Sequence, residues 1–527
     1  KGVDGVAHVL AGRQREISVS EFFAKNRHLL GFDNLAKALL TTVKEAVDNA
    51  LDACEEAEVV PDILVIVTQV AEDRFHVVVE DNGPGIVRGQ VPKIFGKLLY
   101  GSKFHSLKQS RGQQGIGISA AGMYGLLTTG KPVIVTSRTS PRAAARRFEV
   151  AINTKKNAPD ILVDEEVEWV KEHGTRVEIT LQGTYKRGRH SVDGYLKQVS
   201  VANPHARIAY TPPARGGNGD TITYERTSEE LPREPKEIQP HPHGVELGIF
   251  LKMLQETPSR NLSSFLQGEF SRVGNKVIDD LFRELARLGS NLTPKSRPKR
   301  LTVQDTETLH SALSLVKIMS PPTNCLSPIG EELLLNTLRS RVEADFYTTV
   351  ERSPAVYRGN PFQIEVGLAY GGGLPGDELV ELYRYANRVP LQYQRGACAI
   401  TKAVMELPWR NYRISQSRGA LPAAPMILAV HIASVWVPFT SESKEAVAHY
   451  PEILKEIRLA LQEVGRRLSV YISRRRRMAD EHKKRSYIQK YIPHIGIALQ
   501  EILGFSDRSR EETIEMLTDI LERSRKM

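Results

Sequence analysis

Four short polar or glycine-rich motifs follow one another in the first 180 residues of this 527-residue chain. Their order constrains the fold more than any other feature. The first motif lies in an amphipathic pattern over residues 34–58, which predicts a long helix. Glu45, Asn49 and Asp52 are spaced four and three residues apart, so they share one face of that helix. Such a face can bind a metal ion and orient a water molecule, although a solvated helix face has the same pattern.

The second and third motifs are turns that let the backbone approach a ligand. Asp81 ends a predicted strand and is followed by Gly83 and Gly85. Its carboxylate can accept a hydrogen bond from an exocyclic amine, and an ordinary turn is the alternative. The third motif opens a predicted helix at residues 119–127, where free amides can bind phosphate. Its residues are Gly112, Gln113, Gln114, Gly115, Ile116, Gly117, Ile118 and Ser119, with Ser102 and Lys103 just upstream.

The fourth motif is Thr175, which follows His173 and Gly174 at the start of a predicted strand. Residues 125–131 match the spacing of a phosphate-binding P-loop, but Pro132 stands where that loop needs a hydroxyl. Strand-like residues follow at once, so we expect a glycine turn before a strand instead. We therefore place the nucleotide site at the four motifs.

In this order the motifs resemble the Bergerat (GHKL) ATP-binding fold of gyrase, mismatch-repair ATPases, heat-shock chaperones and histidine kinases. The resemblance implies that Glu45 is the general base, that Asn49 ligates Mg²⁺ and that Asp81 reads adenine. It also implies ATP and Mg²⁺ as cofactors. The ATP-binding candidates are then Asn49, Asp52, Asp81, Gly83, Gly85, Ser102, Lys103, Gly112, Gln113, Gln114, Gly115, Ile116, Gly117, Ile118, Ser119, Thr175 and Lys444.

Lys444 follows a predicted strand and loop, at the expected start of a helix. In that position it resembles the switch lysine of gyrase-like ATPases, which reaches the γ-phosphate from a second domain. Lys444 is therefore our second catalytic candidate beside Glu45, and an ordinary surface lysine is the alternative.

The order of domains resembles the nucleotide-binding subunits of type IIB DNA topoisomerases, and the length fits the archaeal type. This implies a multidomain α/β fold. We expect an N-terminal strap at 1–30, a GHKL ATPase α/β sandwich at 31–235, and a helix-two-turn-helix insert at 236–303. A transducer of ribosomal S5 domain 2-like α/β fold follows at 304–478, and a helical C-terminus at 479–527.

The same resemblance implies an ATP-driven homodimer that gates passage of one DNA duplex through a double-strand break, relaxing supercoils and decatenating DNA. No Asp-x-Asp pair for a cleavage metal occurs in the chain, so we expect an A subunit to cut. The implied partners are that subunit, in a tetramer of two A and two B chains, and double-stranded DNA. The apolar residues after 478 are a candidate docking surface, or pack onto this chain's own transducer. A GHKL clamp or chaperone without a cleaving partner is the alternative function.

Charge and composition agree with a DNA partner. The formal net charge is +10, with basic clusters at 295–300, 474–477 and 482–485 that suit a polyanion or a solvated helix face. The three cysteines lie far apart, so we expect reduced thiols. The longest apolar stretch, 426–437, is too short to span a bilayer. We therefore expect no membrane association and a cytoplasmic, nucleoid-associated protein.

Overall fold

The computed structural model describes residues 8, 10–102, 106–112, 115–188, 190–214, 217–441, 443–504 and 506–523. Contacts within the chain group it into two compact units. The first comprises residues 1–407 and 417–464, and the second comprises residues 408–416 and 465–527.

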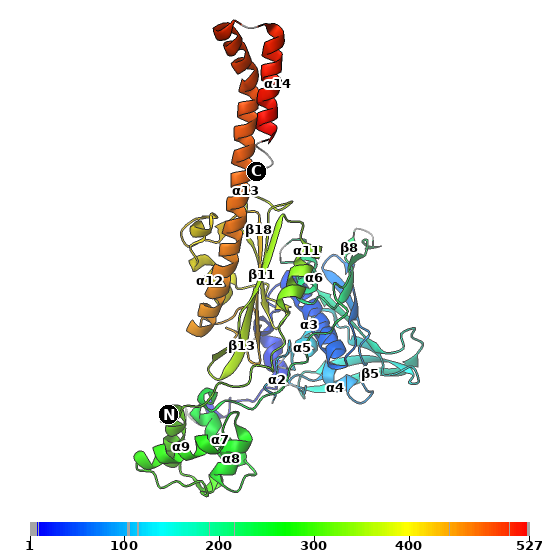
Figure 1. Cartoon of the computed structure of the whole chain (residues 1–527). Coiled ribbons are helices and arrows are strands. Elements are labelled where there is room, and N and C mark those ends of the chain that lie inside the picture. The colour runs from blue at the N-terminus through cyan, green and yellow to red at the C-terminus, as the bar shows by residue number, and fades with distance from the viewer. Residues whose placement is uncertain are drawn as a thin grey trace. The chain divides into compact units, whose positions relative to one another are not determined.

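An eight-stranded sheet organises the N-terminal part of the first unit (Figure 1). Its strand order is β10-β7-β1-β2-β6-β3-β4-β5, and β1 and β7 are its parallel pair. The bounds are β1 Asp62–Ala71, β2 Arg74–Glu80, β3 Val133–Arg138, β4 Ala145–Asn153, β5 Ala158–Val167, β6 Gly174–Gln182, β7 Arg207–Thr211 and β10 Ile222–Tyr224. The strand that we expected before Asp81 is confirmed as β2, and the strand that we expected after Pro132 is confirmed as β3. The edge strand β5 was missed because charged residues break its apolar alternation.

Helices cover one face of this sheet because alternate strand residues, such as Ile63, Val65 and Val67, are buried on that side. These helices are α3 Leu35–Glu56, α4 Val91–Gly96, α5 Gly117–Thr129 and α6 Val192–Ala202. The side chain of Asn34 caps α3 by accepting from the amide of Lys37 at 2.8 Å. Gly130 ends α5 in the left-handed conformation, three residues before β3 begins. The P-loop match is thus a helix end before a strand, as predicted.

The helical insert has its own apolar core. It contains α7 Leu247–Glu256, α8 Leu262–Glu269, α9 Asn275–Arg287 and α10 Val303–Leu315. Each of these helices contributes to that core, through Phe250 of α7, Phe265 of α8, Leu281 of α9 and Leu309 of α10. We expected the insert to end at residue 303, which is the first residue of α10. Because α10 packs into the core of the insert, the insert extends beyond that residue.

A second sheet of six strands carries the rest of the first unit. Its order is β11-β13-β18-β14-β15, with β12 paired to β13. The bounds are β11 Phe346–Glu351, β12 Ala355–Tyr357, β13 Asn360–Tyr370, β14 Glu381–Ala386, β15 Val389–Pro390 and β18 Met426–Ser434. Helix α11, Glu331–Arg341, packs against β11 and β13. Every residue of β18 is buried, which explains the apolar run at 426–437.

The loop after β18 corrects one expectation. We predicted that a helix would begin at Lys444, whereas the next helix, α13 Pro451–Leu503, begins seven residues later at a proline. Lys444 instead has a positive φ of 52° in a loop that an antiparallel bridge between Phe439 and Val447 closes. The switch-lysine candidate thus lies near the tip of a closed loop.

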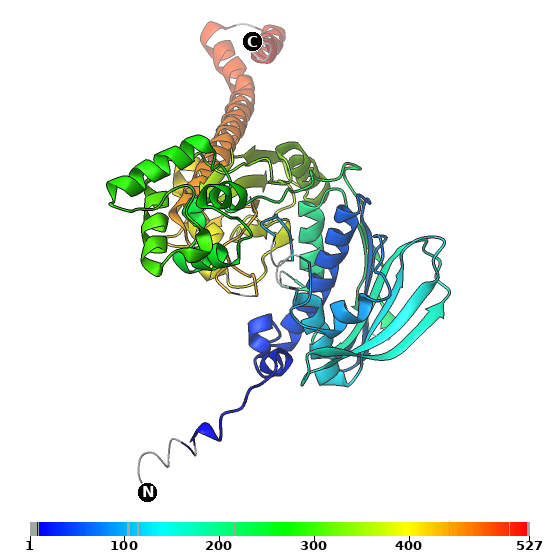
Figure 2. The same cartoon turned by 90° about the horizontal axis from the view of Figure 1, so that it is seen from below.

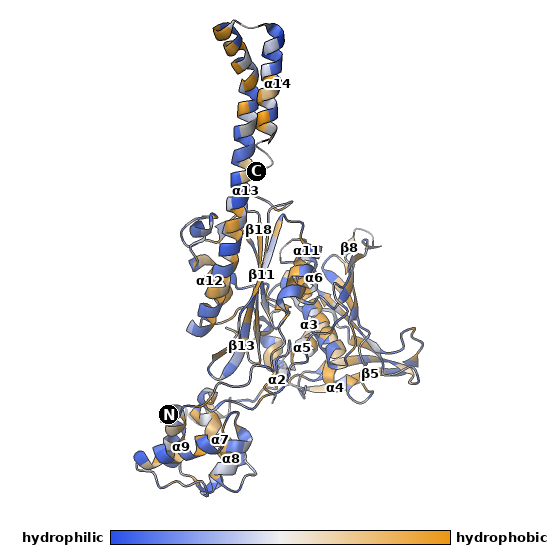
Figure 3. Ribbon diagram, viewed as in Figure 1, coloured by the Kyte–Doolittle hydropathy of each residue, from blue (hydrophilic) through white to orange (hydrophobic). Residues whose placement is uncertain are grey.

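The second unit combines residues 408–416 with a pair of helices. The later part of α13 packs against α14, Asp507–Arg523, where Gly496 contacts Ile514. The helical prediction for 479–527 is confirmed for the part that the structure describes. Figure 3 shows apolar residues along both helices. Among the described residues, no helix combines the length and the apolar character that crossing a membrane requires.

Candidate functional site

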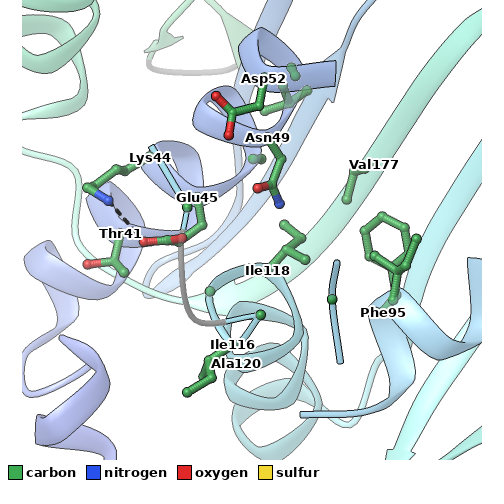
Figure 4. Close-up of a pocket in the computed structure, with 18 of the residues that line it drawn as sticks. Thr41, Lys44, Glu45, Asn49, Asp52, Phe95, Ile116, Ile118, Ala120 and Val177 are labelled. Carbon is green, nitrogen blue, oxygen red and sulfur yellow. Dashed lines mark hydrogen bonds and ion pairs between the residues drawn. The ribbon is translucent and has the colours of Figure 1, made fainter. Parts of the chain in front are cut away.

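The four motifs meet at a cavity of about 670 Å³ in the first unit. This volume suits a cofactor-sized ligand. Figure 4 shows Glu45, Asn49 and Asp52 on α3 beside the start of α5. The predicted residues that line the cavity are Glu45, Asn49, Asp52, Asp81, Gly85, Ser102, Gly112, Gly115, Ile116, Gly117, Ile118, Thr175 and Lys444.

At one end of the cavity, Asp81 sits beneath an apolar slot. Its Oδ1 accepts from the amides of Gly83 at 2.8 Å and Thr175 at 3.1 Å. Burial raises the pKa of Asp81 to about 6, although those two amides pull it down. Val79, Ile86, Phe95 and Val177 are among the apolar lining residues. A buried carboxylate between apolar walls can accept from the amine of a flat heterocycle.

Gly85 lets the backbone turn below this slot. Its φ is +71°, and a Cβ there would lie 2.1 Å from the carbonyl oxygen of Arg138. Only glycine satisfies both constraints. We predicted that this glycine lets the backbone approach a ligand. In the structure it lets the backbone pass close to another backbone segment, at Arg138, and this contact shapes the slot.

Glu45 lies at the other end, with a cation beside it. Lys44 Nζ is 3.0 Å from Glu45 Oε1 and 3.2 Å from Asp48 Oδ2 (Figure 4). Burial acts to raise the pKa of Glu45, but Lys44 and Lys444 outweigh it, and the pKa lies below its usual value. A Cβ on Gly117 would lie 1.8 Å from Glu45 Oε2. An ionised carboxylate thus faces the glycine that opens α5.

Asn49 supplies the oxygen best placed for a metal ion. A Cβ on Gly112 would lie 3.9 Å from Asn49 Oδ1, so the amide oxygen faces the start of the glycine-rich motif. The described residues contain no group of three acidic, histidine or cysteine side chains that could hold a metal ion. One amide oxygen suits Mg²⁺, which keeps waters and takes its other ligands from substrate phosphates.

Lys444 reaches the cavity from the second sheet. Its Nζ donates to the carbonyl of Arg111 at 3.4 Å. Burial lowers its pKa, and the carboxylate of Glu45 opposes that shift. The neighbouring Glu445 pairs with Lys37 of α3 at 2.7 Å. The loop that carries Lys444 is thus tied to the same helix as Glu45.

Several predicted residues have other positions. Ser119 is buried and its hydroxyl donates to the carbonyl of Ile116 at 2.9 Å, so it supports the start of α5 and does not line the cavity. Gly83 does not line the cavity, and its amide donates to Asp81 Oδ1. Asp52 lines the cavity, but its Oδ1 pairs with Arg111 Nη1 at 2.8 Å. Lys103, Gln113 and Gln114 lie outside the described residues.

Sequence reasoning missed other lining residues. Lys44 gave no signal because neighbouring helix residues do not normally share a face. Tyr100 lines the cavity and donates to Gln90 Oε1 at 2.5 Å. Gln392 and Tyr393 come from the segment that follows β15 of the second sheet, and no local pattern could have placed them here.

Two family models match separate parts of the chain. The family described as histidine kinase-, DNA gyrase B-, and HSP90-like ATPase matches residues 34–184. The family described as topoisomerase VI B subunit, transducer, matches residues 321–484. The first range holds the four motifs, and the second holds Lys444 and the six-stranded sheet.

Three curated relatives are each named as the B subunit of type 2 DNA topoisomerase 6. The protein of Archaeoglobus fulgidus is 50% identical over 495 residues, covering 94% of this chain and 80% of that one. That of Methanococcoides burtonii is 48% identical over 499 residues, covering 94% and 79%. That of Natronomonas pharaonis is 36% identical over 701 aligned positions, covering 99% and 87%. With identity this high across most of both sequences, and with both family matches in the expected order, the chain belongs to the family of DNA topoisomerase VI B subunits.

Proposed function

We propose that this chain is the ATP-operated gate of a type II DNA topoisomerase, with DNA cleavage supplied by an A subunit. The observation that carries the proposal is the single cavity that joins Glu45 of the ATPase part to Lys444 of the transducer part. A nucleotide in that cavity would contact both parts at once. Its hydrolysis could therefore change how the two parts are held together.

The chemistry requires little from the protein beyond positioning and charge. Asp81 would recognise adenine, with Thr175 and Gly83 holding its carboxylate. Gly112, Gly115 and Gly117, with Ser102, would give amides and a hydroxyl to the phosphates. Glu45, held ionised, would accept a proton from the attacking water. Lys444 would compensate charge on the γ-phosphate and lose that partner after hydrolysis.

Asn49 would hold Mg²⁺ through its amide oxygen. The ion would neutralise phosphate charge as the terminal phosphoryl group leaves. Ser119 and Asp52 would support the site indirectly, through the start of α5 and through Arg111. Gln113 and Gln114 would belong to the phosphate-binding lid, and Lys103 would add a cation for the phosphates.

Dimerisation of two copies would close the gate. In this single chain, α2 Val19–Lys25 and η1 Arg27–Leu30 lie on their own ATPase part, where Phe23 and Leu30 contact its core. Ser20 donates to Asn157 at 2.9 Å. Phe22 and Leu29 are 41% and 37% exposed. Figure 2 shows the described residues before α2 leading away from the ATPase part, as an exchanging strap requires.

The A subunit would dock on the second unit. Exposed apolar side chains there include Tyr487, Ile488, Tyr491, Ile495, Ile497, Ile502 and Leu503. We propose that these side chains form the interaction surface, because contiguous exposed apolar patches mark such sites. The complex would contain two A and two B chains and would work on chromosomal DNA in the cytoplasm. The exposed arginines at 474–477 would contribute to backbone contacts with DNA.

We assign residues 31–235 to the ATPase domain, 236–318 to the helical insert, 319–478 to the transducer and 479–527 to docking. The test is reconstitution with the A subunit on supercoiled plasmid. Relaxation should require both subunits and ATP, and Glu45→Ala should abolish repeated turnover. ATP hydrolysis without any relaxation in the presence of an active A subunit would favour the clamp or chaperone instead.

A further inference from the structure

We propose that Arg388 of the transducer is a positioning residue for residues 109–112, which lead into the glycine-rich phosphate-binding motif, and that it acts through Glu55 and Arg111. The inference rests on the proposed function of the cavity and adds a second link between transducer and nucleotide. Arg388 lies on the two-residue turn between β14 and β15, far from Lys444 in sequence.

The link is one carboxylate shared by two guanidinium groups. Glu55, in the last turn of α3, receives Arg111 Nη2 at 2.6 Å on Oε1 and Arg111 Nη1 at 2.9 Å on Oε2. Arg388 Nη1 approaches the same two oxygens at 3.3 and 3.4 Å. The Arg111 and Arg388 side chains are only 3% and 5% exposed. Removing one partner of a buried ion pair of this kind strongly destabilises the folded protein.

The transducer supplies one of the two guanidinium groups that neutralise Glu55. The other comes from Arg111 of the ATPase part. His205 Nε2 lies 2.8 Å from Glu55 Oε1, but burial lowers the pKa of His205, which favours the neutral ring. Withdrawal of Arg388 would therefore remove one of the two cations beside the Glu55 carboxylate.

The backbone that precedes the lid is held by the same side of the transducer. Arg111 is the residue before Gly112, the first lid glycine. Asn387 Nδ2 donates to the carbonyl of Ser110 at 3.0 Å. Gln109 exchanges two hydrogen bonds of 2.8 Å with the backbone of Ser327. Residues 109–111 are thus fixed to transducer groups, and the lid begins at the next residue.

Arg388 is itself held rigidly by the six-stranded sheet. Asn387 and Arg388 have φ of 48° and 66°, which suits a two-residue hairpin turn but is uncommon for non-glycine residues. The amide of Arg388 donates to His431 Nε2 at 3.0 Å, and His431 Nδ1 lies 2.6 Å from Glu365 Oε2. A shift of the sheet must therefore carry the Arg388 guanidinium with it.

The test uses the intact chain and follows kcat, KM for ATP, ADP affinity and the ATP-dependent change in small-angle scattering. Arg388→Gln should lower kcat about 10-fold and shrink the scattering change, with ADP affinity kept within about 3-fold. Arg388→Lys keeps the positive charge but loses the forked geometry of the guanidinium. Its kcat and its scattering change should therefore lie between those of the parent chain and those of Arg388→Gln. It also serves as the test if the Gln variant does not fold.

Two further variants separate positioning from general destabilisation. His205→Gln removes another contact of Glu55 that does not come from the transducer, so kcat should stay within about 3-fold of the parent. Adding Glu55→Gln to Arg388→Gln should cost no more than the worse single change, because both act through one carboxylate. Additive losses, or wild-type kinetics and scattering in both Arg388 variants, would overturn the inference. Loss of hydrolysis in the parent chain would instead reject the proposed function.

Discussion

At the scale of single residues, the ends of the cavity show opposite electrostatics. Glu45 has cations beside it and is held ionised, whereas Asp81 is buried among apolar side chains and has a raised pKa. The sequence could identify both, because helix spacing and a turn after a strand are local features. It could not identify Lys44 or Arg388 as partners, since their contacts depend on side-chain reach and long-range packing.

Glu45→Ala should reduce the rate of ATP hydrolysis about 100-fold or more, because the general base for water is lost. ATP affinity should change little, since Asp81, Asn49 and the glycine amides remain. Hydrolysis and nucleotide binding are measured separately, with Glu58→Gln as the control because Glu58 is exposed and outside the cavity. Normal hydrolysis by Glu45→Ala would remove Glu45 from the catalytic assignment.

Asp81 should make nucleotide affinity depend on pH. The pKa of Asp81 in the folded chain is about 6, above the ordinary value of 3.8. Asp81 therefore stabilises the folded state when the pH is below 3.8, and this stabilisation is lost as the pH rises through 6. Recognition of an amine needs the carboxylate, so adenosine affinity should fall as pH drops below about 6. The measurement is adenosine binding by calorimetry from pH 5 to 8.

Asp81→Asn should reverse this balance. Oδ1 of Asn can still accept from Gly83 and Thr175, while the cost of a buried charge disappears. Unfolding free energy at pH 8 without nucleotide should rise by about 1–3 kcal/mol, and adenosine affinity should fall and lose its pH dependence near 6. An Asn variant with wild-type affinity and the same pH profile would contradict the adenine role.

At the scale of elements, the loop that carries Lys444 differs most from its sequence prediction. The apolar pattern after Lys444 continues toward α13, which suggested a helix start. The structure instead closes this segment as a loop, through the Phe439–Val447 bridge and the Lys37–Glu445 ion pair. Such long-range contacts leave no local signal, whereas α3 and β2 were predicted because their periodicity is local.

Lys444→Ala should keep ADP affinity and lose much of the difference between the ATP and ADP conformations. Its charge is the part of the transducer that would sense the γ-phosphate. Small-angle scattering of both nucleotide states measures this difference. Lys402→Ala is the matched control, because that lysine lies on α12 Ala399–Glu406 and not at the cavity. An unchanged ATP-dependent shift in Lys444→Ala would remove Lys444 from the mechanism.

At the scale of the whole molecule, the order of domains was predictable because each motif set is local and the family resemblance supplies the rest. The boundary between insert and transducer was not predictable, because residues 288–302 separate α9 from α10 in the sequence, whereas Leu309 and Leu313 of α10 pack into the core of the insert. The link through Glu55 could not be predicted from the sequence either, because it joins Glu55 to Arg388, 333 positions away.

The central claim is that nucleotide in this cavity closes a gate between two copies of the chain. Sedimentation velocity with a non-hydrolysable ATP analogue tests it most directly. The intact chain should shift from monomer to dimer at saturating analogue. Removal of residues 1–17, the part of the expected strap at 1–30 that precedes α2, should weaken that dimer, because this part would exchange between the copies. A chain that remains monomeric at saturating analogue would contradict the account, whatever its rate of ATP hydrolysis.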